Sequence, residues 1–128
     1  MININEILKN INNNLNYIKF NLKNDSINQF VIDCIANNFK KCNDTFLKIN
    51  DNLQTDLIAN STPSLLLLDD VVELNKQLGQ LCKTCQYFFG ERCQEIVAIK
   101  QLKKDTSLLK ATIKTLGFSG EMLEDEEA

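Results

Sequence analysis

The sequence predicts an all-α fold, either a long antiparallel helical hairpin or a slender three- to four-helix bundle with coiled-coil-type packing. Apolar residues recur at alternating spacings of three and four, which keeps them on one narrow face of a helix. They make up 44% of the 128 residues, enough for a core, whereas one Pro and four Gly leave few turns for β-hairpins. We therefore expect a single helical domain over residues 1–120 and an acidic tail over 121–128.

The first predicted helix spans about residues 3–23. Its apolar stripe consists of Ile4, Leu8, Ile11, Leu15, Ile18 and Leu22. Asn dominates the opposite face, and Asn is a poor helix former because its side chain competes for backbone hydrogen bonds. We expect this helix to need a partner helix for stability.

The second predicted helix spans about residues 27–58. Asn24-Asp25-Ser26 is a break, and Ser26 with Gln29 three residues later fits a capping box. The alternative is that the break is bridged, which gives one helix from 3 to 58. The stripe of this segment consists of Ile32, Ile35, Phe39, Cys42, Phe46, Ile49 and Leu53.

The third predicted helix spans residues 63–89. Thr62 suits its N-cap and Pro63 its first position, because the fixed φ of Pro fits a helix start. Its stripe consists of Val71, Leu74, Leu78, Leu81, Cys85 and Phe88. Gly90 costs about 1 kcal/mol inside a helix, so we expect a bend or break there.

The fourth predicted helix spans residues 92–116. A looser stripe runs through Ile96, Val97, Ile99, Leu102, Leu109, Ile113 and Leu116. Gly117 followed by Phe118 is typical of a helix C-terminus, with glycine in the left-handed conformation and Phe118 folding back towards Ile113.

Charge is segregated along the chain. The last eight residues hold five acids, which leaves 12 acidic and 14 basic residues in the rest. Lys100, Lys103, Lys104, Lys110 and Lys114 cluster in the fourth predicted helix with only Asp105 among them. They can receive an acidic partner, take up the acidic tail or form a solvated face. A net charge of −3 is far from that of a dedicated nucleic-acid binder, so we expect no nucleic acid.

The chain contains no histidine, the commonest general base and metal ligand. We therefore expect no enzyme activity, no cofactor and no small-molecule substrate. Cys82, Cys85 and Cys93 with either Cys42 or Cys34 offer a four-thiolate zinc or redox site as the alternative. Free thiols packed in the core are the reading we favour, because no export signal precedes the five cysteines.

No apolar run reaches the roughly 18 residues of a membrane span. We expect a cytoplasmic protein in a reducing compartment, with the nucleus as a further location.

The stripes predict a non-enzymatic structural or adaptor subunit that joins a larger complex of the cytoskeletal, kinetochore or vesicle-trafficking type. Its expected partners are other helical subunits, in a hetero-oligomer rather than a homodimer. The residues predicted to contact them are Leu8, Ile11, Leu15, Ile18, Leu22, Phe88 and Phe89. Phe88 and Phe89 are included because Tyr87, Phe88 and Phe89 are consecutive and cannot all enter one narrow seam.

Overall fold

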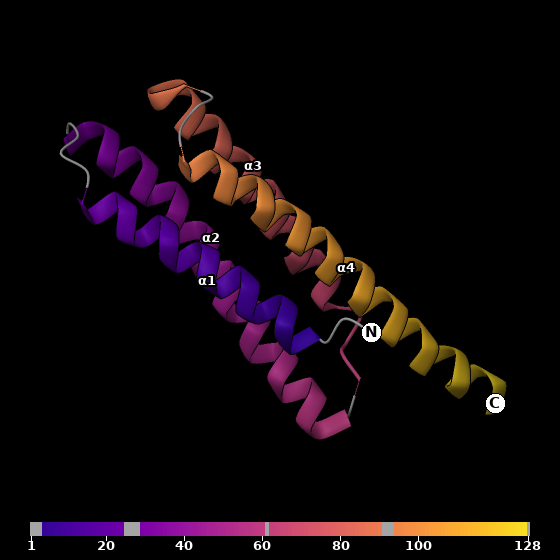
Figure 1. Cartoon of the computed structure of the whole chain (residues 1–128). Coiled ribbons are helices and arrows are strands. Elements are labelled where there is room, and N and C mark those ends of the chain that lie inside the picture. Colours follow the sequence, from indigo (N-terminus) through magenta and orange to yellow (C-terminus); the bar gives the residue numbers. More distant parts are fainter. Residues whose placement is uncertain (1–3, 25–28, 61, 91–93, 128) are drawn as a thin grey trace.

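Four α-helices follow one another in the computed structural model and run alternately up and down (Figure 1). Their bounds are Ile4–Asn24 (α1), Gln29–Asn60 (α2), Leu67–Phe89 (α3) and Gln94–Glu127 (α4). The structure describes residues 4–24, 29–60, 62–90 and 94–127, except the side chains of 21–24, 29, 31–32, 60, 94 and 118–127. No strand occurs among these residues, and the all-α prediction is confirmed.

Each helix packs against two neighbours, so that the four form a ring. The contacts run from α1 to α2, from α2 to α3, from α3 to α4 and from α4 back to α1. Within the described residues no Cα atoms of the diagonal pairs approach within 8 Å, and the α1–α2 contact is the slightest of the four. The chain is therefore an antiparallel four-helix bundle rather than a two-helix hairpin. No described helix combines the length and apolarity that a bilayer crossing needs.

The predicted stripes of α1, α2 and α3 line the core. Their buried residues are Ile4, Leu8, Ile11, Leu15, Ile18, Ile35, Phe39, Cys42, Phe46, Ile49, Leu53, Val71, Leu74, Leu78, Leu81 and Cys85. The looser stripe of α4 is partly wrong, because Val97 is 70% exposed and Leu116 is 40% exposed. The buried Thr106 takes a core position there, and its hydroxyl donates to the Leu102 carbonyl at 2.7 Å. The expected roles of Leu22, Ser26, Gln29, Ile32, Cys93 and Phe118 lie outside the described side chains.

Two separate helices replace the alternative of one helix from 3 to 58. The chain reverses between α1 and α2, so that the start of α1 lies beside the end of α2 (Figure 1). The Gln54 side-chain amide accordingly donates to Asn5 Oδ1 at 3.1 Å. A continuous helix would hold these two residues more than 70 Å apart, at about 1.5 Å per residue.

Helix α3 begins at Leu67, four residues later than predicted from Pro63. The residue responsible is Ser64. Its N–H donates to Asp56 Oδ2 at 3.0 Å, its hydroxyl oxygen accepts from the Leu66 N–H at 3.2 Å, and its carbonyl accepts from the Leu67 N–H at 3.2 Å. These bonds satisfy backbone groups in a turn before the helix, so the prediction of Thr62 as N-cap is wrong.

Gly90 ends α3 as expected. Its φ is 76°, a value that favours glycine, and its N–H donates to the Gln86 carbonyl at 2.9 Å. The predicted helix end at residue 89 is confirmed. Residues 91–93, where the fourth helix was expected to begin, lie outside the described part of the chain.

Helix α4 continues to Glu127, so the predicted end at residue 116 is wrong. Gly117 lies inside the helix and faces the loop before α3. A Cβ at this position would lie 2.9 Å from Leu65 Cγ and 3.4 Å from the Pro63 carbonyl oxygen. The glycine therefore serves a close approach between helix and loop, and not a left-handed turn.

Candidate interaction surface

Four of the residues predicted to bind a partner do not lie on the surface. Leu8, Ile11, Leu15 and Ile18 are 4%, 1%, 1% and 0% exposed, because α2 and α4 cover the inner face of α1. The fifth, Leu22, lies outside the described side chains. The helix partner that the Asn-rich α1 was expected to need is supplied by the same chain.

Phe88 and Phe89, the other two predicted contacts, are half-buried against the edge of the core. Phe88 packs edge-to-face against Phe30 at a centroid distance of 6.4 Å and against Tyr87 at 5.1 Å. Interplanar angles of 81° and 85° are the arrangement that aromatic quadrupoles favour. Phe88 therefore supports an aromatic cluster whose outer members are Phe30 and Tyr87.

The end of α1, the start of α2 and the end of α3 lie at the same end of the bundle (Figure 1), and these segments carry exposed aromatic side chains. We call this set the aromatic end; its exposed members are Tyr17, Phe20, Phe30 and Tyr87, at 41%, 67%, 67% and 83%. Sequence reasoning missed Phe20 and Phe30. The signal was present, because both residues fall outside the three-and-four spacing of their stripes, and a helix has only one face to bury in a narrow seam.

A hollow of about 450 Å³ adjoins the aromatic end between α1 and α4. Tyr17 and Asn14 line it from α1, and Val97, Ala98 and Gln101 line it from α4. Val97 is exposed although it follows the buried Ile96, since consecutive residues of a helix point about 100° apart. The hollow continues the apolar surface from the end of the bundle onto its side.

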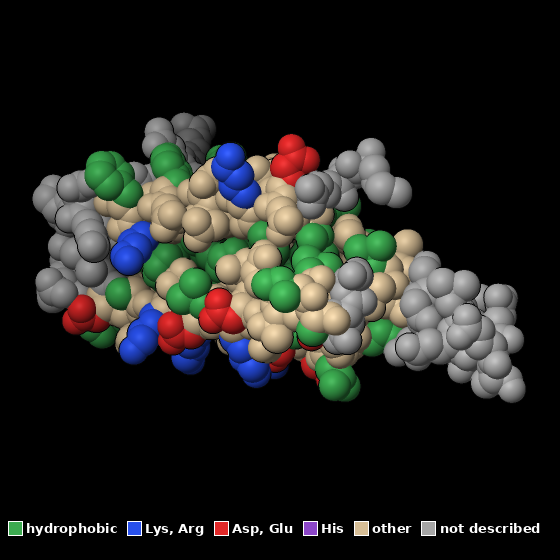
Figure 2. All heavy atoms as spheres, turned by 90° about the horizontal axis from the view of Figure 1, so that it is seen from below, with side chains coloured by type: hydrophobic (Ala, Val, Ile, Leu, Met, Phe, Trp, Pro, Cys, Tyr) green, Lys and Arg blue, Asp and Glu red, His purple; other side chains and the backbone are tan. Residues whose placement is uncertain are grey.

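Apolar side chains elsewhere on the surface are more scattered. Figure 2 shows one face on which hydrophobic side chains form separate patches among polar ones, and acidic and basic side chains alternate along one edge. Ile58 and Leu66, 84% and 83% exposed, lie near the opposite end of the bundle from the aromatic end. They provide a matched comparison for any test of the aromatic end.

The cysteines lie mostly in the core. Cys42, Cys82 and Cys85 are buried and Cys34 is half-buried, all four as free thiols. Burial raises the pKa of Cys42 from 9.0 to about 12, with a smaller opposing effect from a backbone hydrogen bond. The described residues contain no group of three or more Cys, Asp or Glu side chains placed to hold a metal. Cys93, which was predicted to join Cys82 and Cys85 in that site, lies outside the described residues.

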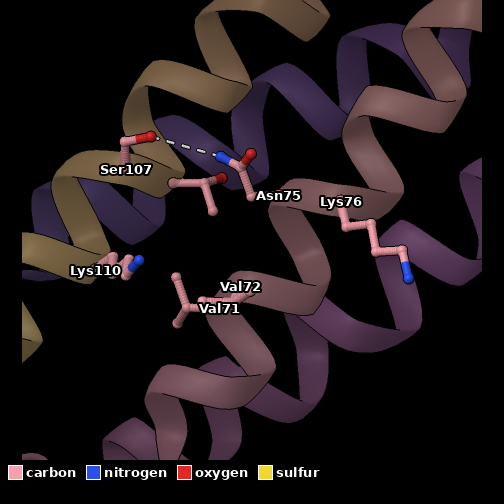
Figure 3. Close-up of a pocket in the computed structure, with 7 residues that line it drawn as sticks. Val71, Val72, Asn75, Lys76, Ser107 and Lys110 are labelled. Carbon is pink, nitrogen blue, oxygen red and sulfur yellow. Dashed lines mark hydrogen bonds between the residues drawn. The ribbon is translucent and has the colours of Figure 1, made fainter.

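A second hollow, of about 310 Å³, lies between α3 and α4 (Figure 3). Val71 and Val72 contribute apolar surface, and the Asn75 side-chain amide donates to Ser107 Oγ across the helix pair at 3.5 Å. Lys110 lines the α4 side, and Lys76, which also lines the hollow, extends from α3 away from Lys110 (Figure 3). We call this hollow, with the adjacent Lys103, the lysine groove.

The lysine groove carries charge that the rest of its surroundings do not neutralise. Lys103 Nζ lies over Gly79, where a Cβ would be 3.7 Å away. Among the described side chains, the ammonium groups of Lys76, Lys103 and Lys110 have no carboxylate partner. Asp105, the one acid between Lys100 and Lys114, is only 8% exposed and accepts from the Gln101 side-chain amide at 3.2 Å. The exposed charge of this stretch of α4 is therefore positive.

Comparison with protein-family models, with curated proteins and with solved structures gives no match. The arrangement of the side chains themselves must therefore carry any functional conclusion.

Proposed function

We propose that this protein is a non-enzymatic adaptor or structural subunit that joins a complex of other proteins through its aromatic end. The observation that supports the proposal is the exposure of Phe20, Phe30 and Tyr87, which are 67%, 67% and 83% exposed at one end of a closed bundle. Aromatic side chains are enriched at the centres of protein interfaces, because they bury a large area with few rotatable bonds.

The free energy gained by covering these aromatic rings is large enough to anchor specific binding. Burying a phenylalanine fully contributes about 1.5–3 kcal/mol, so covering three largely exposed aromatic rings contributes about 3–6 kcal/mol. Association costs are of the same order, which makes these rings the anchors of an interface and not the whole of it. The hollow beside Tyr17 and Val97 adds apolar surface contiguous with them.

Another helical protein is the partner class we propose, in a hetero-oligomer. The hollow between α1 and α4 presents Tyr17, Val97 and Ala98 from two adjacent helices, and a further helix can pack there with its ridges of side chains entering the space between them. Assemblies of the cytoskeletal, kinetochore or vesicle-trafficking type are built from such helical subunits and form the setting we propose. The lack of histidine in the sequence supports a binding role over catalysis.

An intracellular, reducing location belongs to the same proposal, in the cytoplasm or the nucleus. Its support is that the four described cysteines are free thiols, three of them packed in the core. A buried thiol such as Cys42 acts there as a small apolar side chain.

The test compares two double variants with the wild-type chain in affinity capture from native cells, with quantitative mass spectrometry. Phe30→Ser with Tyr87→Ser removes two anchors of the aromatic end, and Ile58→Ser with Leu66→Ser removes equally exposed apolar side chains near the other end. We expect the first pair to lose a defined set of proteins by more than about tenfold and the second to retain it. Both must keep the wild-type helical content and melting temperature.

Two outcomes would count against the proposal. In one, the wild-type chain captures no protein in reproducible stoichiometry. In the other, the captured set survives loss of the aromatic anchors and falls away with the Ile58 and Leu66 substitutions.

A further inference from the structure

The acidic end of the chain and the lysine groove have complementary charge, but the same helix keeps them apart. Residues 121–127 contain five acids, and α4 continues through them as one helix to Glu127 (Figure 1). Glu121 lies about 10 Å along the axis from Lys114 and about 16 Å from Lys110, at 1.5 Å per residue. On a helix only side chains three or four residues apart face each other. The tail therefore does not fold back over the lysines of its own helix.

We propose that the lysine groove binds the acidic segment 121–127 of a second copy of this chain, in a two-fold symmetric dimer. Charge complementarity supports this occupant, because five acids meet a groove whose three lysines have no carboxylate partner among the described side chains. The position of the segment supports it as well. Helix α4 carries it past the end of the bundle, where another copy can reach it (Figure 1).

In an antiparallel pair of α4 helices, the acidic segment of each copy can lie in the lysine groove of the other copy. If residue 116 of each helix lies at the crossing point, residues 121–127 of one copy lie opposite residues 111–105 of the other. Ser107 lines the lysine groove, so each acidic segment runs along the groove of the other copy. The same contact forms twice about the two-fold axis, which is the closed symmetry commonest among dimers.

The acidic segment also contains the apolar pair Met122 and Leu123. The lysine groove offers Val71 and Val72, of which Val72 is 48% exposed, in a hollow of about 310 Å³. Apolar side chains in the hollow with acids against its lysine rim would make an interface with a dry centre and a charged edge. We therefore expect the association of the two copies to weaken strongly with salt, since exposed charges are screened over about 10 Å at 0.1 M salt.

This surface is distinct from the aromatic end, and a dimer formed through it leaves that end open. The inference does not depend on the proposed hetero-oligomeric partner.

Sedimentation equilibrium of the full-length chain at about 50 mM and about 500 mM salt tests the dimer. We expect a monomer–dimer equilibrium at low salt whose dissociation constant rises about tenfold or more at high salt. A first variant replaces the acids of the tail by their amides, as Glu121→Gln, Glu124→Gln, Asp125→Asn, Glu126→Gln and Glu127→Gln. A second replaces the groove lysines, as Lys76→Gln, Lys103→Gln and Lys110→Gln. Each should abolish the dimer while leaving the melting temperature of the monomer unchanged.

The matched control is Lys40→Gln with Lys41→Gln, which removes two exposed lysines of α2 and should leave the dimer intact. An equimolar mixture of the tail variant and the groove variant contains one intact tail–groove pair per dimer. It should recover association to an intermediate extent.

Carbodiimide cross-linking of mixed isotopically labelled and unlabelled protein locates the contact. Cross-links that join residues 121–127 of one copy to Lys76, Lys103 or Lys110 of the other support the inference. A chain that stays monomeric at millimolar concentration and low salt overturns it, as does a dimer that the tail and groove variants leave unchanged. Cross-links from the tail confined to its own chain would also overturn it.

Discussion

The same substitution should change stability in opposite directions at Gly79, inside α3, and at Gly90, directly after its end. Gly79 lies in the middle of the helix, where alanine is favoured over glycine by about 1 kcal/mol. A Cβ there would meet only Lys103 Nζ, at 3.7 Å, which is ordinary van der Waals contact. Nothing opposes the gain in helix propensity, so Gly79→Ala should raise the free energy of unfolding by about 0.5–1 kcal/mol.

Gly90 presents the reverse case. Its φ of 76° and ψ of 179° fall in a region that residues with a Cβ avoid, at a cost of about 1–3 kcal/mol. A Cβ there would have no described atom within 4 Å, so steric overlap with neighbouring residues contributes nothing. Gly90→Ala should therefore lower the free energy of unfolding by about 1–3 kcal/mol through the backbone alone.

Urea titration and thermal unfolding, both followed by far-ultraviolet circular dichroism, measure the two effects. For a domain of this size each kcal/mol shifts the melting temperature by about 3–5 °C. We expect Gly79→Ala to melt above the wild type and Gly90→Ala below it, with a difference of about 5–20 °C between the variants. Shifts of the same sign, or an unchanged melting temperature for Gly90→Ala, would refute the assignment of Gly90 as a helix stop and Gly79 as a helix interior.

Three further predictions concern the core, a buried thiol and a loop. Phe46→Ala should cost about 3–5 kcal/mol in urea unfolding, because Phe46 is 1% exposed, whereas Phe20→Ala, at an exposed position, should cost less than about 1 kcal/mol. The raised pKa of Cys42, about 12 against 9.0, favours the folded state fully below pH 9, and this stabilisation should be lost as the pH rises from 9 to 12. Urea titrations across that range measure the loss, and Cys42→Ser should flatten it. Ser64→Ala should lower the free energy of unfolding by about 1 kcal/mol in thermal unfolding, since its hydroxyl accepts from the Leu66 N–H. An unchanged stability would contradict the role of Ser64 at the start of α3.

The fold could be predicted because helix spacing acts locally. Leu74, Leu78 and Leu81 follow one another at three and four residues, so any helix through them presents one apolar face. All three are fully buried in the bundle. The errors lie at the helix ends, where a single side chain or close contact decides. Ser64 delays α3, and Gly117 allows α4 to pass the loop at Leu65.

The candidate surfaces could not be predicted in the same way. The stripe of α1 predicts that Leu8 needs an apolar neighbour, but the sequence does not say whether that neighbour is in the same chain. The answer depends on how the four helices share one core. In the structure α2 and α4 enclose the stripe of α1, and Leu8 is buried there. Phe30 and Tyr87 lie far apart in the sequence and meet through Phe88 only because the end of α3 packs beside the start of α2.

The amino-acid sequence by itself determined that the chain is helical, which residues of each helix are apolar, and where Gly90 interrupts it. Those properties depend on residues within about one helical turn, because helix propensity and the direction of each side chain are set by the local backbone. The tertiary structure decided that the apolar stripes of this chain pack against one another, which leaves the aromatic end and the lysine groove as the exposed surfaces for which we propose binding. It also brought Lys76 of α3 and Lys110 of α4 to the lining of one hollow, a placement of distant residues that helix packing alone creates.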